Sequence, residues 1–444
     1  MNHNRLKLFV LSLDGTPYTL LQQALQQGLM PHFAQLLREG SFAQMDSVIP
    51  TISSVAWATF ATGVNPAKHN IFGFVDRDQN AQLIIPNASN LRAKSLWEYF
   101  DENKLRSIWI NLPIAYPPPK INGVMISGFL GTELENCVHP PELLPILKKC
   151  DYVIDPDPWL ARTDRAAFMK ELFRALQARR KITLHLLNEP WDFFMLHVME
   201  TDRLHHFFWD AKDDSRSPFH NSFWELYREI DQFIGELISM LPSDCALLML
   251  SDHGFCALKR EVDLNAYLQQ TGFLRYKNGQ AQELSDVHPH SRAYSLLPGR
   301  LFVNLKGRES QGSVSFSEYE GVRTEVSEAL LELKDPETRA SIIKQVVKRE
   351  KIYSGPHADR GADLIAIPYD GYDLKARLNG AQLFNKSAIN GMHTFDDAFL
   401  YVRHHSIQTM PKPALIDVTS TIFALMGLSI PKELEGRNML GANT

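Results

Sequence analysis

The chain has few cysteines, no long apolar run and little excess charge. Its four cysteines among 444 residues are scattered and form no CxxC pair, which favours reduced thiols in a cytosolic protein over a disulfide framework. No apolar stretch approaches the roughly 18–20 residues of a membrane span. The formal net charge of −5 gives no electrostatic reason to expect nucleic acid or an anionic membrane as the main partner. We therefore expect a soluble, cytoplasmic protein with no nucleic acid polymer as its partner.

The remaining composition is that of a globular protein with a large core. Hydrophobic residues make up 44% of the chain and charged residues 22%, which excludes wholesale disorder. The length suggests two or three domains, although large α/β enzymes often form one unit. The first apolar run, LKLFVLSL, ends at once in Asp14 and Gly15, which predicts a buried strand rather than a signal peptide.

Short apolar runs alternate with amphipathic segments along the chain. The runs lack polar alternation, as buried parallel strands do, and lie at residues 6–13, 107–112, 191–199, 245–252 and 363–369. Apolar residues recur at three- and four-residue steps in helical segments at 19–38, 165–188, 218–240 and 415–426. The alternation predicts an α/β fold with a mostly parallel central sheet sandwiched by helices. Such sheets bind ligands at the carboxyl ends of their strands.

Two stretches do not follow this alternation. Residues of about 78–160 are rich in proline, and residues of about 256–390 form short pieces punctuated by turns. We interpret both stretches as insertions that decorate the sheet and cover its site, within a single catalytic domain over residues 1–444.

Carboxylate and hydroxyl side chains follow the first strand. Asp14 comes directly after it, and the next residue is a glycine that permits a sharp turn, so the carboxylate is well placed to bind a metal ion. The segment PTISSVAWATFATG carries five hydroxyls, including those of Ser53 and Ser54. A hydroxyl near a helix N-terminus gains from the helix dipole, and it becomes a nucleophile when a base or a metal activates it. Helix capping is the structural alternative for each of these residues.

Three further sites combine aspartate and histidine. Asp202 and His206 stand four residues apart, so a helix places both on one face within reach of a single ion, and the adjacent histidine lies one step round. Asp252 and His253 end another buried strand, where they can bridge two neighbouring metal ions. His393 lies in a glycine-containing loop ahead of the apolar segment AFLYV. Buried histidines are commoner than ligands, yet three such sites in one α/β chain together predict a metal centre.

Nine segments form an ordered set along nearly the whole chain: SLDG, GLMPHFAQLLREGSF, PTISSVAWATFATGVNPAKHNIFGF, ISGF, TDRLHH, LSDHGF, RAYSLLPGRLFVNLKGRESQG, GMHTFDDAF and IDVTSTIFALMGLSIPKELEGR. This set resembles the alkaline phosphatase superfamily, in its type I phosphodiesterase/nucleotide pyrophosphatase-like branch. The most similar group is described as AlkP-type phosphohydrolases or phosphomutases. The resemblance implies an alkaline phosphatase-like fold with inserted cap regions.

The resemblance also implies the roles of individual residues. Ser53 occupies the nucleophile position, where members often have threonine, and Ser54 is the alternative if the register shifts by one. Two divalent metal ions are implied, zinc as the first expectation and manganese as the alternative. The implied ligands are Asp14, Ser53, Asp252 and His253 for one ion and Asp202, His206 and His393 for the other.

The implied mechanism is in-line displacement on a small-molecule phosphate ester. One metal ion lowers the pKa of the Ser53 hydroxyl, and both ions neutralise the phosphoryl and leaving oxygens. A phosphoseryl intermediate forms and is then hydrolysed by water on the second ion.

Contacts to the substrate depart from the family pattern. Phosphodiesterase members carry an asparagine soon after the nucleophile, and Phe74 stands at the corresponding position here. No unambiguous equivalent is found for the phosphate-clamping arginine of alkaline phosphatase. Asn111, Arg292 and Arg308 are candidates for replacement contacts, with a structural role as the alternative for each. The preference for monoesters or diesters therefore stays open.

Three functions are compatible with these residues. The first is a hydrolase of phosphate esters, either a phosphodiesterase or a phosphatase. The second is a metal-dependent phosphotransferase or phosphomutase, which passes the phosphoryl group to an alcohol. The third is a metal-stabilised binding protein without turnover, against which the intact hydroxyl of Ser53 counts. A sulfatase is disfavoured because SSVAW lacks the C/S-x-P-x-R motif.

Overall fold

The computed structural model describes residues 6–78, 82–279, 281–378 and 382–441. The chain divides into unit 1, with residues 1–64, 87–256 and 389–444, and unit 2, with residues 65–86 and 257–388. The stretch of about 256–390, expected as an insertion, thus corresponds to the larger segment of unit 2. The other expected insertion, about 78–160, is divided between the two units at residue 87. A role of either stretch in covering the site stays a prediction.

Unit 1 is built on an eight-stranded sheet with the strand order β2-β19-β9-β1-β8-β5-β6-β7. Five neighbouring strands, from β9 to β6 in this order, pair in parallel, while β19, β2 and β7 join through antiparallel pairs. The sheet is therefore mostly parallel, as predicted. Its strands are β1 (Leu8–Leu13), β2 (Gly40–Met45), β5 (Ser107–Leu112), β6 (Gly123–Ser127), β7 (Val138–His139), β8 (Phe193–Val198), β9 (Ala246–Leu250) and β19 (Ala398–Arg403).

The central strands form where the sequence has uninterrupted apolar runs. Strands β1, β5 and β8 are buried at every position. Polar alternation is absent because neither face of these strands meets water. Four of the five predicted strand ranges are confirmed in this sheet, as β1, β5, β8 and β9.

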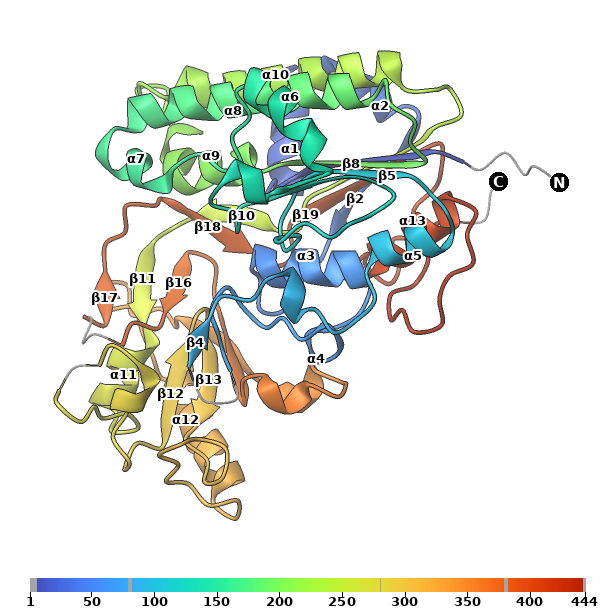
Figure 1. Cartoon of the computed structure of the whole chain (residues 1–444). Coiled ribbons are helices and arrows are strands. Elements are labelled where there is room, and N and C mark those ends of the chain that lie inside the picture. Colours follow the sequence, from blue (N-terminus) through green and yellow to red (C-terminus); the bar gives the residue numbers. More distant parts are fainter. Residues whose placement is uncertain (1–5, 79–81, 280, 379–381, 442–444) are drawn as a thin grey trace. The chain divides into compact units, whose positions relative to one another are not determined.

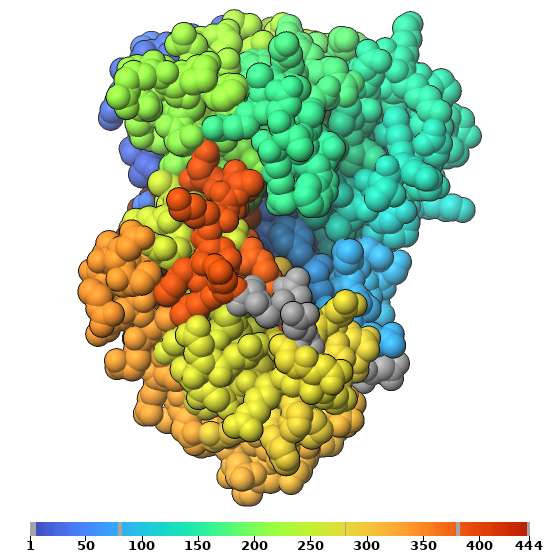
Figure 2. All heavy atoms as spheres, turned by 90° about the vertical axis from the view of Figure 1, so that its left-hand side faces the viewer, coloured from blue at the N-terminus to red at the C-terminus, as the bar shows by residue number. Residues whose placement is uncertain are grey.

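Helices cover both faces of the sheet, as Figure 1 shows. One face carries α1 (Tyr18–Gln26), α2 (Pro31–Leu36), α6 (Leu144–Lys149), α8 (Arg165–Leu186) and α10 (His220–Met240), and the other carries α3 (Ser53–Thr62), α5 (Leu96–Glu102) and α13 (Leu415–Leu425). The helices predicted at 165–188, 218–240 and 415–426 are confirmed as α8, α10 and α13. In the space-filling view of Figure 2, the segment from α6 through α7 (Pro158–Thr163) to α10 forms a continuous part of the surface of unit 1. Within the described ranges, no helix is long and apolar enough to cross a membrane.

The single helix predicted over 19–38 is wrong, because the chain breaks there into α1 and α2. Gly28 follows α1 with a φ of +69°, a left-handed conformation that glycine adopts without steric cost. Pro31 opens α2, where its missing N–H is no loss. The apolar spacing continues across the break because both helices bury one side, with Leu21 in α1 and Phe33 in α2.

The carboxyl ends of three neighbouring strands meet at one edge of the sheet. Strand β1 lies between β8 and β9 and pairs with both in parallel. The chain leaves β8 directly into α9 (Glu200–Phe208) and leaves β9 toward β10 (Gly254–Ala257), which pairs with β18 (Gly391–Thr394). Because the connections diverge to either side of β1, this edge is a topological switch point, where α/β sheets bind ligands.

Helix α3 is buried on all sides. Each of its ten residues is buried, which is typical of a helix that is apolar around its whole circumference. Gly63 ends the helix in the left-handed conformation, with a φ of +65°. The first residue of this enclosed helix is Ser53, so the packing of α3 fixes the position of that hydroxyl.

Unit 2 contains a four-stranded antiparallel sheet with the order β12-β13-β15-β14, against which α12 (Tyr319–Leu331) packs. Its strands are β12 (Ala293–Leu296), β13 (Arg300–Val303), β14 (Ile343–Lys348) and β15 (Leu364–Pro368). The prediction of a parallel-type strand at 363–369 is wrong, because β15 pairs antiparallel with β13 and β14. An apolar run indicates burial and carries no information on strand direction. The other elements of unit 2 are α4 (Pro66–His69), β3 (Asp76–Arg77), β4 (Leu83–Ile84), β11 (Arg260–Asp263), α11 (Leu264–Gln270), β16 (Tyr372–Lys375) and β17 (Phe384–Asn385).

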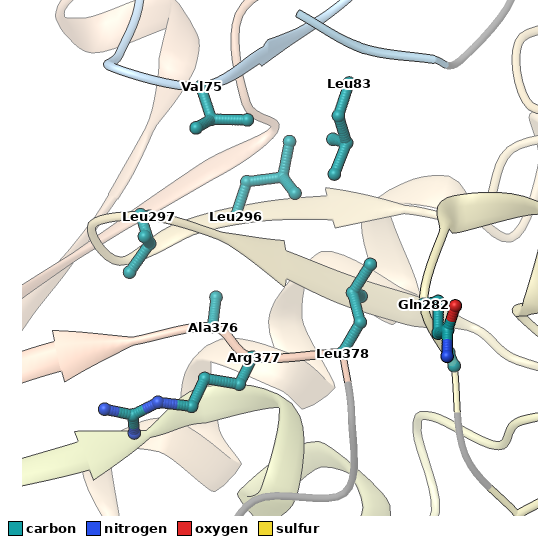
Figure 3. Close-up of a pocket in the computed structure, with 9 residues that line it drawn as sticks. Val75, Leu83, Gln282, Leu296, Leu297, Ala376, Arg377 and Leu378 are labelled. Carbon is teal, nitrogen blue, oxygen red and sulfur yellow. The ribbon is translucent and has the colours of Figure 1, made fainter. Parts of the chain in front are cut away.

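Unit 2 also contains an open cavity of about 530 Å³. Figure 3 shows Val75, Leu83, Leu296 and Leu378 gathered around it, while the guanidinium of Arg377 is directed away from these side chains. Its described lining residues include no carboxylate, imidazole or thiol. The cavity therefore offers apolar contact and none of the chemistry that the sequence predicts.

Candidate metal centre

Asp14 is the first residue after β1, and its carboxylate is buried. The next residue, Gly15, has a φ of +59°, and a Cβ there would lie 2.8 Å from Phe255 and 2.9 Å from His253. The turn and the close approach of these two rings both require glycine. The backbone N–H of Gly15 donates to Asp252 Oδ1 at 3.1 Å, which ties the end of β1 to the end of β9.

Three predicted ligands, Asp14, Asp252 and His253, form a group that we term the closed cluster. Their ligand atoms all lie within 4.8 Å of one another. Nε2 of His253 lies 3.6 Å from Asp14 Oδ1 and 3.4 Å from Asp252 Oδ2, and Ser53 Oγ lies 3.3 Å from the same nitrogen. The three side chains are at most 1% exposed. The closed cluster therefore lies beneath the surface, with the serine hydroxyl beside it.

Asp202, His206 and His393 form a second group, the open cluster, whose ligand atoms also lie within 4.8 Å of one another. Asp202 Oδ1 lies 3.4 Å from Nε2 of His206 and 3.3 Å from Nε2 of His393. The two imidazole side chains are 19% and 15% exposed. Helix α9 supplies the first two residues four apart on one face, as predicted from their spacing, and β18 supplies the third.

The two clusters are neighbours. The rings of His253 and His393 stack with their centroids 3.6 Å apart and an angle of 22° between their planes. Six of the seven predicted ligands thus belong to two adjacent clusters, and Ser53 contacts one of them. The two imidazoles of the open cluster are more exposed than the side chains of the closed cluster. The binding of metal ions by these residues stays a prediction.

Backbone carbonyls orient the three imidazoles. Nδ1 of His206 and Nδ1 of His253 each lie 3.0 Å from a carbonyl oxygen, and Nδ1 of His393 lies 3.3 Å from Thr51 O. A carbonyl oxygen is only an acceptor, so each Nδ1 carries a hydrogen, and each Nε2 is the nitrogen that faces its cluster. Metal-ligating histidines are held in this manner by a contact at their other nitrogen.

The donor atoms of both clusters fit divalent cations. Oδ1 of Asp14, Oδ1 of Asp202 and Oδ2 of Asp252 are buried atoms for which the described part of the chain supplies no hydrogen-bond donor. A buried carboxylate oxygen needs a hydrogen bond or a cation. In the open cluster, the two Nε2 atoms lie 3.1 Å apart. A tetrahedral ion with bonds of roughly 2.0–2.1 Å holds its ligand atoms about 3.3 Å apart, which matches the spacings of this cluster.

The electrostatics of the clusters also favour a cation. Burial raises the pKa of Asp14 well above its ordinary value, and the negative charges of Asp252 and Asp202 raise it further. Burial also acts to raise the pKa of Asp202, but the neighbouring imidazoles and Arg203 hold it below its ordinary range. Burial lowers the pKa of His206 to about 3, so this imidazole is neutral at pH 7. Burial and mutual repulsion therefore disfavour the ionised form of Asp14, and a bound cation would relieve both.

Of the two candidate nucleophiles, the geometry favours Ser53. As the first residue of α3, Ser53 places its hydroxyl at the positive end of a helix dipole and beside His253. The Oγ of Ser54 is buried and lacks a hydrogen-bond partner among the described residues. Adjacent residues of a helix are turned about 100° from each other, so the two hydroxyls are directed differently.

His205, the histidine next to the open cluster, is engaged elsewhere. Its Nδ1 lies 3.0 Å from Gly15 O, and its Nε2 lies 2.8 Å from the hydroxyl of Tyr227. With both ring nitrogens engaged, His205 supports the turn after β1 and has no nitrogen left for a metal ion.

The three predicted substrate contacts are engaged within their own units. Asn111, in unit 1, is fully buried with a φ of +65°, and its Oδ1 accepts a hydrogen bond from a tyrosine hydroxyl at 3.3 Å. In unit 2, Arg292 forms a two-point ion pair with Glu325, and Arg308 forms one with Asp363. Contact between these side chains and a substrate stays a prediction.

Sequence reasoning missed three side chains that support the ligands. The indole N–H of Trp57 donates to Asp14 Oδ2 at 3.3 Å, and Nε2 of His197 lies 3.1 Å from the same oxygen. Arg203 donates to Asp202 Oδ2 at 3.1 Å. A signal existed for His197, since a lone imidazole inside the apolar run WDFFMLHVM needs a buried partner. Trp57 gave none because its partner lies on a separate element, and Arg203 gave none because a pair of adjacent opposite charges is common in helices.

Taken with the sheet, the paired carboxylate and imidazole clusters beside a helix-borne hydroxyl place the molecule in the class of alkaline phosphatase-like enzymes. Residues 8–396 match the family described as type I phosphodiesterase / nucleotide pyrophosphatase. The chain belongs to this family, within the alkaline phosphatase superfamily, and is a hydrolase of phosphate esters.

Solved structures share the fold. Phosphonoacetate hydrolase from Sinorhizobium meliloti 1021, in complex with phosphonoacetate, is similar with a TM-score of 0.64 and 15% identity over 95% of each chain. Murine ectonucleotide pyrophosphatase/phosphodiesterase 5 is similar with a TM-score of 0.56 and 17% identity, over 98% of this chain and 100% of that chain. An inactive variant of the murine protein, in complex with AMP, has a TM-score of 0.56 and 16% identity. At such identities, the likeness concerns the fold alone.

Proposed function

We propose that this hydrolase acts on small-molecule phosphodiesters through a phosphoryl-enzyme intermediate at Ser53, with two divalent cations held by the closed and open clusters. The position of Ser53 Oγ, 3.3 Å from Nε2 of His253 at the first residue of α3, carries the proposal. It places one hydroxyl beside buried ligand atoms and at the positive end of a helix.

Enzymes of the alkaline phosphatase superfamily generally depend on divalent metal ions, and the clusters fit such ions. When bound, the cations would stabilise the charge of the phosphoryl and leaving oxygens and lower the pKa of a neighbouring hydroxyl. We assign Asp14, Ser53, Asp252 and His253 to one ion and Asp202, His206 and His393 to the other. Imidazole with carboxylate and without thiolate suits zinc, our first choice, and also manganese.

The reaction then consists of two successive displacements at phosphorus. The oxygen of Ser53 attacks phosphorus, the bond from phosphorus to the leaving alcohol breaks, and the alcohol takes up a proton. Water next cleaves the bond between Ser53 and phosphorus, which regenerates the hydroxyl and releases the phosphate product. The rigid packing of α3 holds the nucleophile in place, so little ordering is required on binding.

The charge of the site supports a diester over a monoester. While Ser53 is protonated, three carboxylates and two divalent cations leave one positive charge, which a phosphodiester monoanion neutralises on binding. The nearby guanidinium of Arg203 adds no free positive charge, because it is paired with Asp155 and Asp202. A monoester dianion would leave the site negative, and its second charge would lack a partner.

Replacement of Ser53 tests the nucleophile. We expect Ser53→Ala to lower the turnover of bis(4-nitrophenyl) phosphate about 10³-fold or more, whereas Ser54→Ala stays within a few-fold of wild type. Elemental analysis of both variants should show retained metal ions. Turnover of Ser53→Ala at the wild-type rate would refute the assignment.

A substrate panel tests the reaction class. We expect kcat/KM for bis(4-nitrophenyl) phosphate to exceed the value for 4-nitrophenyl phosphate, with phosphonoacetate as a third substrate. Addition of glycerol as an acceptor separates hydrolysis from the alternative, a phosphotransferase or phosphomutase. If most of the product carried the phosphoryl group on glycerol, hydrolysis would not be the main reaction.

A cytoplasmic location also stays a proposal. It fits the four free cysteines, and cell fractionation tests it.

A further inference from the structure

The two oxygens of Asp202 have different surroundings. Oδ1 lies 3.4 Å from Nε2 of His206 and 3.3 Å from Nε2 of His393, within the open cluster. Oδ2 faces the other way and accepts a hydrogen bond from Nη1 of Arg203 at 3.1 Å. The guanidinium therefore sets the rotation of the carboxylate and leaves a single oxygen for a cation. It also places a positive charge next to the cluster that we propose to bind a cation.

Asp155 holds that guanidinium. Its Oδ1 accepts from Nε of Arg203 at 2.9 Å, and its Oδ2 accepts from Nη2 at 2.6 Å, the two-point geometry that fixes an arginine most firmly. The two side chains are 16% and 18% exposed. This pair offsets the charge of Arg203 and directs its third nitrogen at Asp202.

The segment that carries Asp155 is itself anchored inside unit 1. Arg179 of α8, which is fully buried, donates from Nη1 to the Tyr152 hydroxyl at 2.9 Å and from Nη2 to Ile154 O at 2.8 Å. Its Nε donates to both oxygens of Glu200, the first residue of α9, at 2.7 and 2.9 Å. One buried arginine thus ties the segment before α7 to the helix that bears Asp202 and His206.

We propose that Asp155 is a positioning residue for the open cluster: it neutralises and orients Arg203, which in turn presents one oxygen of Asp202 to the cation. This inference rests on the proposed binding of a cation by that cluster. The two effects act in the same direction. Without the carboxylate, Arg203 is free to rotate away from Asp202, and its uncompensated charge repels the cation.

A purely structural role for Asp155 predicts a different outcome. An ion pair with partly exposed partners contributes little to folding. Loss of a residue that orients a metal ligand typically lowers metal affinity or activity about 10–100-fold. Asp155→Asn is therefore expected to fold normally and to bind one of its two cations more weakly.

The experiment compares Asp155→Asn with Asp157→Asn in stepwise removal of zinc from the loaded proteins by a chromophoric chelator. Asp157 is a matched control, since it lies in the same segment and its substitution changes the charge equally. Its carboxylate accepts a hydrogen bond from Trp159 N at 2.9 Å, a capping contact that asparagine also makes. We expect the affinity for one zinc ion to fall about 10–100-fold in Asp155→Asn and the affinity for the other to stay at the wild-type value. Asp157→Asn should match the wild type at both steps.

A double-mutant cycle identifies the route of the effect. In the Arg203→Met background, the further change Asp155→Asn should alter zinc affinity less than about two-fold, because the carboxylate has lost the group that it positions. Wild-type affinity for both ions in Asp155→Asn would overturn the inference, as would an undiminished effect in the Arg203→Met background. If the wild-type protein bound fewer than two zinc ions, the proposed function itself would fail, so the two failures are distinguishable.

Discussion

At the scale of single residues, Asp14 shows how the demands of function and folding conflict. Its carboxylate is buried next to the carboxylates of Asp252 and Asp202. Burial and the two neighbouring negative charges all raise the pKa of Asp14. In the absence of a cation, burial and repulsion therefore disfavour the ionised form of Asp14 in the folded protein. Such a residue is retained for binding and lowers the stability of the metal-free protein.

Asp14→Asn should separate these two roles. With a chelator present at pH 7, we expect the variant to be more stable than wild type by about 1–2 kcal/mol in urea denaturation, while its activity is lost. The amide oxygen can still accept from Trp57, so the packing is retained. Because folding raises the pKa of Asp14, the folded state takes up its proton first as pH falls, and the stability difference should shrink toward acid pH. A variant less stable than wild type at pH 7 would contradict this account.

At the scale of elements, the turns that end β1 and α1 each contain a glycine with positive φ. Only the glycine after β1 has close neighbours. Gly15 has a φ of +59° and close neighbours, whereas Gly28 has a φ of +69°, and a Cβ added there would meet nothing within 4 Å. The two positions therefore separate the cost of backbone conformation from the cost of a steric clash.

Gly15→Ala should destabilise the protein by about 2–4 kcal/mol, the sum of a left-handed alanine and an overpacked contact with Phe255 and His253. It should also weaken metal binding, since the ring of His253 has to move. Gly28→Ala should cost only about 1 kcal/mol and leave metal content unchanged. Thermal denaturation with elemental analysis measures both effects, and equal losses in the two variants would show that the clash plays no part.

The sequence predicted most of the elements that carry the site and was wrong where local signals conflict. Runs such as 107–112 are apolar because both faces of the sheet are covered, and this cause is local enough to be visible in the sequence. The break between α1 and α2 was missed because the apolar side continues across Gly28 and Pro31. The antiparallel pairing of 363–369 was missed because partners and direction are set by distant strands.

At the scale of the whole molecule, residues from 14 to 393 converge because parallel strands end at a shared edge. That geometry made Asp14, Asp202 and Asp252 predictable as neighbours, since each follows a strand that carries an apolar run. The network of Asp155, Arg203 and their buried neighbours could not be predicted, because an ion pair between a loop and a helix leaves no periodic pattern. The share of residues 65–86 in unit 2 was likewise not predicted, since a long gap in sequence separates them from residues 257–388.

Removal of metal ions should therefore act on one unit. All six cluster residues belong to unit 1, where cations would hold the ends of β1, β8 and β9 together against carboxylate repulsion. A ligand at 100 times its dissociation constant stabilises the folded state by about 2.7 kcal/mol. In hydrogen exchange, we expect a chelator to lower protection in α9, β18 and the turn after β1, and re-added zinc to restore it. Strands β13 and β15 of unit 2 should exchange at the same rate in both states, because their hydrogen bonds do not depend on the cations. A uniform loss of protection across β13 and β15 would instead mean that the cations hold the whole chain together, a role that clusters confined to one unit do not explain.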